Sequence, residues 1–279
     1  MIIGKQRRTT VSPRPGTAHP GQDRDDAFWR DFLLQGGDTW QGIGRRIFKR
    51  IPASPRCRMC ASPFRGPGAP FMRLIGKRQS DANPNWCTSC FNVMAKHRGG
   101  ADVEMAMLFA DIRGSTSLAE RMSSGEFHAL LNRYLATATE VVFRHDGVVD
   151  KFVGDELVAM FFPLLTGERY VARTVEAARD LLRATGHNGS REPWVSIGIG
   201  VHSGTAWFGV LGEGSHIEMT VVGDAVNVAA RLAAAAGPGE VLVSGDAADA
   251  AGLDPTLGRR SLTLKGKELP VEVVTVRVD

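Results

Sequence analysis

Residues 103–116 read VEMAMLFADIRGST, an apolar run that stops at the carboxylate of Asp111. The length and apolar character of this run predict a buried strand. The turn that follows contains the small residues Gly114, Ser115 and Thr116. A carboxylate at a strand end, followed by such a turn, can hold a metal ion and present backbone amides to phosphate groups. The stretch is therefore a candidate site for a phosphate-bearing ligand and its cation.

A second aspartate, Asp155, follows about forty residues later in the sequence KFVGDEL at residues 151–157. The Gly154-Asp155 pair predicts a hairpin turn between strands over 148–152 and 157–162. If these strands pair with the first strand, Asp111 and Asp155 lie side by side. Two adjacent carboxylates suit two divalent cations a few ångströms apart. The plainer alternative is that Asp155 only makes the turn.

The remaining periodicity predicts helices and strands in alternation. Apolar stripes with helical spacing lie in residues 126–144 and 171–182, and an alanine-rich helix is expected over 224–236. Further strands are expected at 194–201, 205–210, 217–222, 262–264 and 271–278. This order predicts an α+β fold of the ferredoxin-like βαββαβ type, in which helices cover one face of a largely antiparallel sheet.

A third motif reads MTVVGDAVNVAAR at residues 219–231, and a fourth, LKGKELPVEVVTV, contains Lys265. With all four motifs in this order, residues 103–277 resemble the class III nucleotidyl cyclase catalytic domain, the family of adenylate and guanylate cyclases. The resemblance covers nearly two thirds of the chain. It implies a catalytic domain over 101–279.

The resemblance also implies a metal and phosphate site. Asp111 and Asp155, with the backbone of Ile112, correspond to the residues that hold two Mg²⁺ or Mn²⁺ ions in the family. The backbone from Ile112 to Thr116, which includes Gly114 and Ser115, corresponds to the loop that receives the β- and γ-phosphates.

Five further side chains correspond to substrate and transition-state contacts of the family. Lys151 resembles the lysine that reads the base, and Thr220 occupies the position of its partner. Asn227 resembles the residue that orients the ribose, and Arg231 resembles the arginine that stabilises the α-phosphate. Lys265 resembles the lysine that neutralises the terminal phosphates. A plainer interpretation exists for each: Asn227 and Arg231 could form a solvated helix face, and Lys151 could be a surface lysine.

Donor and acceptor chemistry at Lys151 and Thr220 indicates the nucleotide. Lys151 can only donate, which suits the N1 acceptor of adenine, and the Thr220 hydroxyl can accept from the 6-amino group. Guanine would require an acceptor such as Glu in place of the lysine. We therefore expect an adenylate cyclase that makes 3′,5′-cyclic AMP and pyrophosphate from ATP for intracellular signalling. The family resemblance implies a homodimer with shared active sites.

All four cysteines lie in the first hundred residues, as the pairs Cys57/Cys60 and Cys87/Cys90. Two C-x2-C pairs separated by 26 residues are typical of a tetrahedral zinc site. A structural Zn²⁺ in a zinc-ribbon-like module over 52–100 is therefore expected. Separate pairs of free thiols, or a redox pair, are the alternatives, and disulfides are the weakest interpretation in a reducing compartment.

The N-terminal segments differ in composition from the rest of the chain. Residues 1–100 carry 18 Lys and Arg against 6 Asp and Glu, and residues 101–279 carry 16 against 24. Residues 1–25 are polar and predict a disordered tail, and residues 26–51 predict short amphipathic helices. These helices could pack on the zinc module or touch a membrane surface.

The basic half leaves open an alternative function as a nucleic-acid-binding or scaffold protein, with the cyclase domain as a nucleotide sensor.

At 279 residues the chain has the length of about two domains, and 43% hydrophobic content is ordinary for a globular protein. No apolar run has the length of a membrane span, and no signal peptide is recognisable, so a cytoplasmic location is expected.

Overall fold

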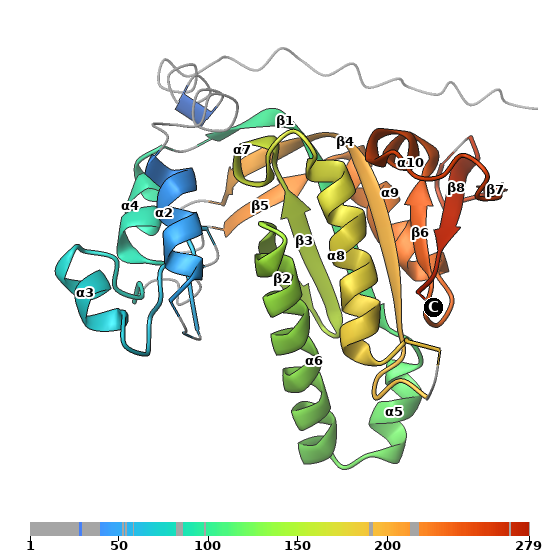
Figure 1. Cartoon of the computed structure of the whole chain (residues 1–279), viewed down its shortest axis with the longest axis horizontal. Coiled ribbons are helices and arrows are strands. Elements are labelled where there is room, and N and C mark those ends of the chain that lie inside the picture. The colour runs from blue at the N-terminus through green and yellow to red at the C-terminus, as the bar shows by residue number, and fades with distance from the viewer. Residues whose placement is uncertain are drawn as a thin grey trace, which may run out of the picture.

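The computed structural model describes residues 28–29, 40–51, 53, 55–57, 59–81, 86–97, 99–189, 192–212, 218–267 and 269–278 (Figure 1). The tail expected at residues 1–25 lies outside this part of the chain. The helices are α2 (Trp40–Lys49), α3 (Ala69–Leu74), α4 (Thr88–Lys96), α5 (Ser115–Arg121), α6 (Ser124–Arg144), α7 (Pro163–Thr166), α8 (Tyr170–Thr185), α9 (Asp224–Ala235) and α10 (Gly245–Ala251).

One mixed sheet forms the centre of the molecule. Its strands are β1 (Gly99–Ile112), β2 (Val148–Val153), β3 (Glu156–Phe161), β4 (Ile197–Leu211), β5 (Glu218–Val222), β6 (Val241–Ser244), β7 (Arg259–Leu262) and β8 (Val271–Val276). They are arranged in the order β2-β3-β1-β4-β6-β8-β7, and β5 pairs with β4 outside this path. The β4–β6 pair is parallel and the other pairs are antiparallel, which agrees with the expected α+β class.

The pairing of β1 with β4 runs without a break from Gly99↔Val210 to Ile112↔Ile197. The sequence predicted two strands in this region, 194–201 and 205–210, and this prediction was wrong. The residues expected to separate them, at 202–204, pair with residues 105–107 of β1. The sequence of residues 202–204 does not by itself predict a strand. These residues are nevertheless extended, because the long, continuous β1 offers backbone hydrogen-bond partners along this stretch.

Local capping explains where the long helices begin and end. α6 begins at a capping box, in which the Ser123 hydroxyl accepts from the Glu126 amide and the Glu126 carboxylate accepts from the Ser123 amide. α8 ends at Gly186, whose φ of 100° lies in the left-handed region. The predicted helices at 126–144, 171–182 and 224–236 are thus confirmed within a few residues, whereas β6 and α10 were not predicted.

Both faces of the sheet are covered. Alternate residues of β1, such as Leu108, pack with α6, α8 and α10, and their neighbours, such as Met107, face the side covered by α9 and residues of the N-terminal segment. The expectation that the helices lie on one face therefore needs correction for α9. The reason lies in β4, where Gly200 lets the backbone of α9 approach the sheet: a Cβ there would lie 2.2 Å from the Ala233 nitrogen.

The N-terminal segment is tied to the sheet by buried polar contacts. The Arg45 guanidinium, on α2, is 1% exposed and donates to the carbonyl oxygens of Met59 and Gly147. Lys49 forms an ion pair with Asp146 at 2.6 Å. α2 therefore packs on the segment around Met59 and on the loop between α6 and β2, which favours the first of the two roles expected for residues 26–51. Among the described helices, none combines the length and apolar character that a membrane span requires.

The sheet is curved so strongly that β2 and β5 meet, although β3, β1 and β4 separate them in the strand order. The Thr220 hydroxyl on β5 lies 3.1 Å from a carboxylate oxygen of Asp150 on β2. Nearby, the rings of Phe162 and Phe208 make an edge contact with centroids 5.0 Å apart. The curved sheet therefore surrounds an apolar region that contains Phe162 and Phe208, and the hydrogen bond between Thr220 and Asp150 lies at the edge of this region.

We expect Gly200→Ala to destabilise the protein by about 2 kcal/mol or more, because the new methyl group would collide with the backbone of α9. Gly125→Ala, in α6, is the matched control, since its Cβ would meet no atom within 4 Å and alanine favours helix. Urea unfolding followed by tryptophan fluorescence measures both. Equal midpoints for the two variants would contradict the close approach of α9 to β4.

Candidate functional site

The two aspartates singled out from the sequence meet at one edge of the sheet. Asp111 is near the end of β1, and Asp155 lies in the turn between β2 and β3. The pairing of Ala110 with Leu157 places the turn beside the end of β1. Asp155 Oδ2 is buried and has no hydrogen-bond partner in the described part of the chain. An unpartnered buried carboxylate oxygen beside a second carboxyl group fits a divalent cation.

Electrostatics at this pair also favour a cation. Burial, together with the hydrogen bond and charge of Asp155, raises the pKa of Asp111 to about 7, and Arg113 opposes this rise. The Arg113 guanidinium donates to the Asp111 carboxylate and to the carbonyl oxygens of Ala234 and Ala236, the latter two at 3.3 Å. Arg113 therefore connects the carboxylate pair to the end of α9.

The loop after Asp111 has a defined backbone conformation. Gly114 has a φ of 70° and precedes α5, which begins at Ser115 and continues through Thr116. A residue with a Cβ would be strained at this φ. The Arg113 amide donates to the Ser196 carbonyl at 2.8 Å, which fixes the loop against the residues before β4. The first amides of α5 lack helical acceptors and are available to a ligand.

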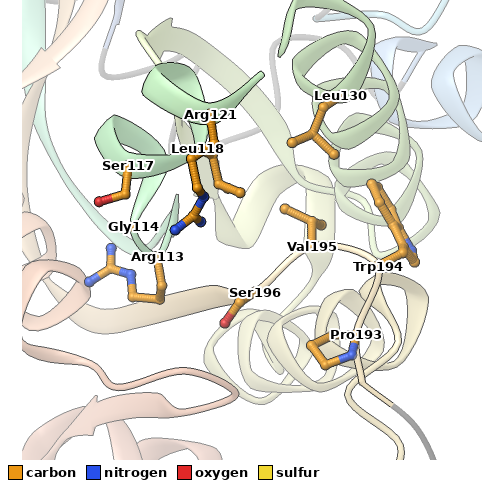
Figure 2. A pocket seen from close by; sticks show the side chains of 10 residues that line it. All are labelled: Arg113, Gly114, Ser117, Leu118, Arg121, Leu130, Pro193, Trp194, Val195 and Ser196. Carbon is orange, nitrogen blue, oxygen red and sulfur yellow. The ribbon is translucent and has the colours of Figure 1, made fainter. Parts of the chain in front are cut away.

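A pocket of about 470 Å³ adjoins this loop (Figure 2). Arg113, Gly114 and Ser117 line one side of it, and Pro193 and Trp194 line the other. The carboxylates of Asp111 and Asp155 do not line it. The pocket therefore lies beside the predicted phosphate loop and is not the cation site itself.

Lys151 and Thr220, which were predicted to contact the base, are brought together by the curvature of the sheet. Lys151 Nζ lies 3.8 Å from Asp150 Oδ2, and the Thr220 hydroxyl donates to the same oxygen at 3.1 Å. Lys151 also forms an ion pair with Glu218 at 2.9 Å. A donor-only ammonium and a hydroxyl thus share one small region at the junction of β2 and β5.

The two α9 residues lie one turn apart, Asn227 exposed and Arg231 half-buried. Gly266 packs against the Arg231 guanidinium, and a Cβ on this glycine would lie 3.2 Å from its Nη2. Lys265, next to this glycine, is exposed, whereas Lys267 forms an ion pair with Asp224 at 2.5 Å. The loop before β8 therefore packs along α9, with Lys267 at its first residue and Gly266 beside Arg231.

The predicted residues form three groups that remain separate within one chain. Among the described residues, no hydrogen bond or ion pair links Asp111 or Asp155 to Thr220, Asn227 or Arg231. Two residues of these groups, Asp150 and Arg113, were not predicted from the sequence. Asp150 had a recognisable signal, since it is a carboxylate within the predicted strand, directly after the apolar pair Val148-Val149. Arg113 had none, because its contacts with α9 are distant in sequence.

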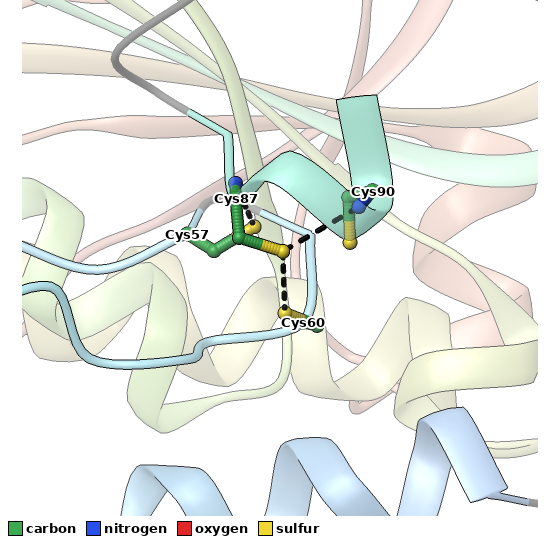
Figure 3. A group of neighbouring side chains, drawn as sticks. All are labelled: Cys57, Cys60, Cys87 and Cys90. Atoms are coloured by element: carbon green, nitrogen blue, oxygen red, sulfur yellow. Dashed lines mark hydrogen bonds between the residues drawn. The ribbon is translucent and has the colours of Figure 1, made fainter. Parts of the chain in front are cut away.

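The four cysteines form a second candidate centre (Figure 3). Their Sγ atoms all lie within 4.8 Å of one another, and those of Cys60 and Cys87 are 3.6 Å apart. Thiolates around one tetrahedral zinc ion are about 3.8 Å apart, so the cluster fits a single metal. The Cys87 amide lies 3.3 Å from the Cys57 Sγ, a contact that supports a metal-binding thiolate. Thiol hydrogen bonds, from Cys57 foremost, hold the pKa of Cys87 well below its usual range.

Comparison with curated proteins gives a family match and two informative relatives. The sequence profile described as "Adenylate and Guanylate cyclase catalytic domain" matches residues 101–271. An adenylate cyclase of Anabaena cylindrica is 40% identical over 134 residues, which are 46% of this chain and 26% of the relative. An uncharacterized protein of Mycobacterium tuberculosis is 36% identical over 182 residues, 63% of this chain and 33% of the relative. The chain thus spans a third or less of these relatives.

Solved structures show the same similarity. The guanylyl cyclase Cya2 is 28% identical with a TM-score of 0.57, over 64% of this chain and 93% of that one. The adenylyl cyclase CyaB from P. aeruginosa is 26% identical with a TM-score of 0.56, over 64% and 96%. Because the two neighbours are named for different nucleotides, the overall similarity does not decide the base.

Proposed function

The chain belongs to the adenylate and guanylate cyclase catalytic domain family, and from this premise we propose that it is an adenylate cyclase acting on ATP. The observation that carries the choice of ATP is the meeting of Lys151 and Thr220 at one carboxylate oxygen of Asp150. A donor for N1 and a hydroxyl for the 6-amino group match adenine. The Anabaena cylindrica relative, named an adenylate cyclase, supports the same choice.

In the proposed reaction, the 3′-hydroxyl of the ribose attacks the α-phosphorus and pyrophosphate leaves. Asp111 and Asp155 would hold Mg²⁺ or Mn²⁺, which lowers the pKa of the attacking hydroxyl and stabilises the leaving phosphates. Asn227 would orient the ribose, which lowers the entropic cost of bringing the hydroxyl into line with phosphorus. Arg231 would donate to the α-phosphate oxygens, where negative charge grows.

The remaining predicted residues would bind the triphosphate. The amides of Ser115 and Thr116, after Gly114, would contact the β- and γ-phosphates together with the Ile112 backbone. Lys265, which is exposed next to α9, would neutralise the terminal phosphates. These contacts increase the binding energy and hold the leaving group in place.

We also propose that the active site is shared between two copies of the chain. Support comes from the three separate groups of predicted residues, since no hydrogen bond or ion pair among the described residues joins Asp111 or Asp155 directly to Thr220, Asn227 or Arg231. The contact through Arg113 reaches only the C-terminal end of α9. In a two-fold symmetric homodimer, one protomer would supply Asp111 and Asp155 with the phosphate loop. Its partner would supply the base-reading residues and α9. Each dimer would then have two equivalent sites.

We further propose that Cys57, Cys60, Cys87 and Cys90 bind one structural zinc ion. Two cationic side chains near the cluster support this proposal. Four thiolates carry four negative charges, a divalent metal balances only two of them, and nearby cations can offset the rest. Burial lowers the pKa of Lys77, but the charges of the cysteines outweigh burial and the net shift is upward. Burial lowers the pKa of Arg45, and Asp146 and the cysteines oppose this shift.

The alternative of a nucleic-acid-binding or scaffold protein has less support. Several basic side chains of the N-terminal half are engaged within the molecule. Arg45 donates to two carbonyl oxygens, Lys49 pairs with Asp146, and Arg56 donates to carbonyl oxygens of residues 48, 51 and 61. Cations used in this way are not free to contact phosphates.

The purified protein, assayed with Mn²⁺ or Mg²⁺, should convert ATP to cyclic AMP at least about tenfold more efficiently than it converts GTP, because one mismatched polar contact is worth this much or more. Product analysis by chromatography gives kcat/KM for each nucleotide. Equal efficiencies would contradict the assignment of Lys151 and Thr220 to the base, and no product from either nucleotide would contradict the proposed activity.

Asp111→Ala and Arg231→Ala should each be nearly inactive alone, because each removes one part of every site. Mixed in equal amounts with free exchange, about half the dimers would be heterodimers, each with one intact site. Activity should therefore recover to about a quarter of that of the wild type. A lack of recovery, with subunit exchange shown separately by differently tagged chains, would contradict the shared site.

Metal analysis of the purified chain should find about one zinc ion per chain, and Cys57→Ser with Cys60→Ser should lose it. Because metal binding contributes directly to folding, the cysteine variant should also unfold at a lower temperature. Ser89→Ala, between Cys87 and Cys90, leaves all four thiols in place and is the control. Reduced protein with no bound zinc would overturn the proposal.

A further inference from the structure

We propose that Asp150 is a positioning residue that holds the Thr220 hydroxyl as a hydrogen-bond acceptor toward the nucleotide and so discriminates against a 6-oxo purine. The proposal rests on the proposed function, since it assumes that Lys151 and Thr220 contact the base. It adds a residue that neither the motifs nor the family match singled out.

The contact between Asp150 and Thr220 is buried and direct. Thr220 is 3% exposed, and the side chain of Asp150 is 2% exposed. The Thr220 Oγ1 lies 3.1 Å from Asp150 Oδ2, and Lys151 Nζ lies 3.8 Å from the same oxygen. The ammonium group places a positive charge beside the buried carboxylate, which partly offsets the cost of removing that carboxylate from water.

The direction of this hydrogen bond follows from the chemistry of the two groups. An ionised carboxylate can only accept, so the hydroxyl of Thr220 must donate to it. A threonine hydroxyl has one proton and two lone pairs. With its proton directed to Asp150, the hydroxyl can only accept a hydrogen bond from a bound nucleotide.

An acceptor at this position distinguishes the two purines at atom 6. The 6-amino group of adenine can donate to the Thr220 oxygen. The 6-oxo group of guanine or hypoxanthine would face that oxygen with a second acceptor, and the contact would be lost or repulsive. A threonine free to rotate would accommodate either group. Asp150 thus converts an adaptable hydroxyl into a selective one.

The test uses ATP and inosine triphosphate, which carries the 6-oxo group of guanine and lacks the 2-amino group, so that only atom 6 and N1 differ from ATP. Asp150→Leu removes the acceptor at similar volume and should lower the ATP preference, measured as a ratio of kcat/KM values, by about tenfold. Asp150→Asn keeps an acceptor oxygen without the charge and should retain most of the preference. Asp150→Ala is a second test if the leucine variant does not fold.

A double-mutant cycle with Thr220→Val shows whether Asp150 acts through the hydroxyl. Thr220→Val alone should lower the preference by a similar factor, and Asp150→Leu should cause no further change in that background. Asp180→Asn is the control, since this carboxylate lies on α8 and accepts from His145 at 2.8 Å, and its loss should not change the ratio.

Three results would overturn the proposal. The first is an unchanged ATP preference in folded Asp150→Leu or Asp150→Ala protein. The second is a further loss of preference when Asp150→Leu is added to Thr220→Val, as large as the loss that Asp150→Leu causes in the wild-type protein. The third is an unchanged preference in Thr220→Val. Wild-type protein that makes cyclic AMP from ATP would leave the proposed activity intact in each case, so the two failures are distinguishable. The third result would also contradict the assignment of Thr220 to the base.

Discussion

The continuous pairing of β1 with β4 is the constraint on which the other parts of the molecule depend. From Gly99↔Val210 to Ile112↔Ile197 the two strands share one register. That register sends alternate side chains to opposite faces, so that each face acquires its own apolar core. It places Asp111 at one end of the ladder and leaves Gly200 opposite α9. A slip by one residue would exchange the two faces and displace the carboxylate from its partner.

Sequence reasoning succeeded where the signal was local. The stripes that predicted α6 and α8 are visible within a single helix, and Gly154-Asp155 marked the turn between β2 and β3. It failed where the determinant was distant. The continuity of β4 depends on pairing with β1, and the position of α9 depends on Gly200 meeting a backbone about thirty residues later.

The same distinction applies to the candidate site. The motifs pointed to Lys151 and Thr220 because their spacing follows a known family. They did not point to Asp150, because its role appears only when the sheet curves and β2 reaches β5. The sequence likewise predicted a four-cysteine cluster from spacing alone, and the four sulfur atoms are indeed close together. It could not predict that Arg45 would join Met59, which lies between Cys57 and Cys60, to Gly147, since no local pattern marks a cation that hydrogen-bonds to carbonyl oxygens.

The apolar face shared with the N-terminal segment has an evolutionary consequence. Trp29 makes an edge contact with Phe208, at 6.0 Å between ring centroids, and both belong to a core that also includes Phe64 and Met160. Substitutions at these positions are therefore constrained by a partner in another part of the chain. We expect them to co-vary across descendants of this protein. Recombination that joined residues 101–279 to a different N-terminal segment would expose this apolar surface to solvent. Such a chimaera would remain folded and unaggregated only if polar substitutions replaced the exposed apolar residues or the new segment covered them.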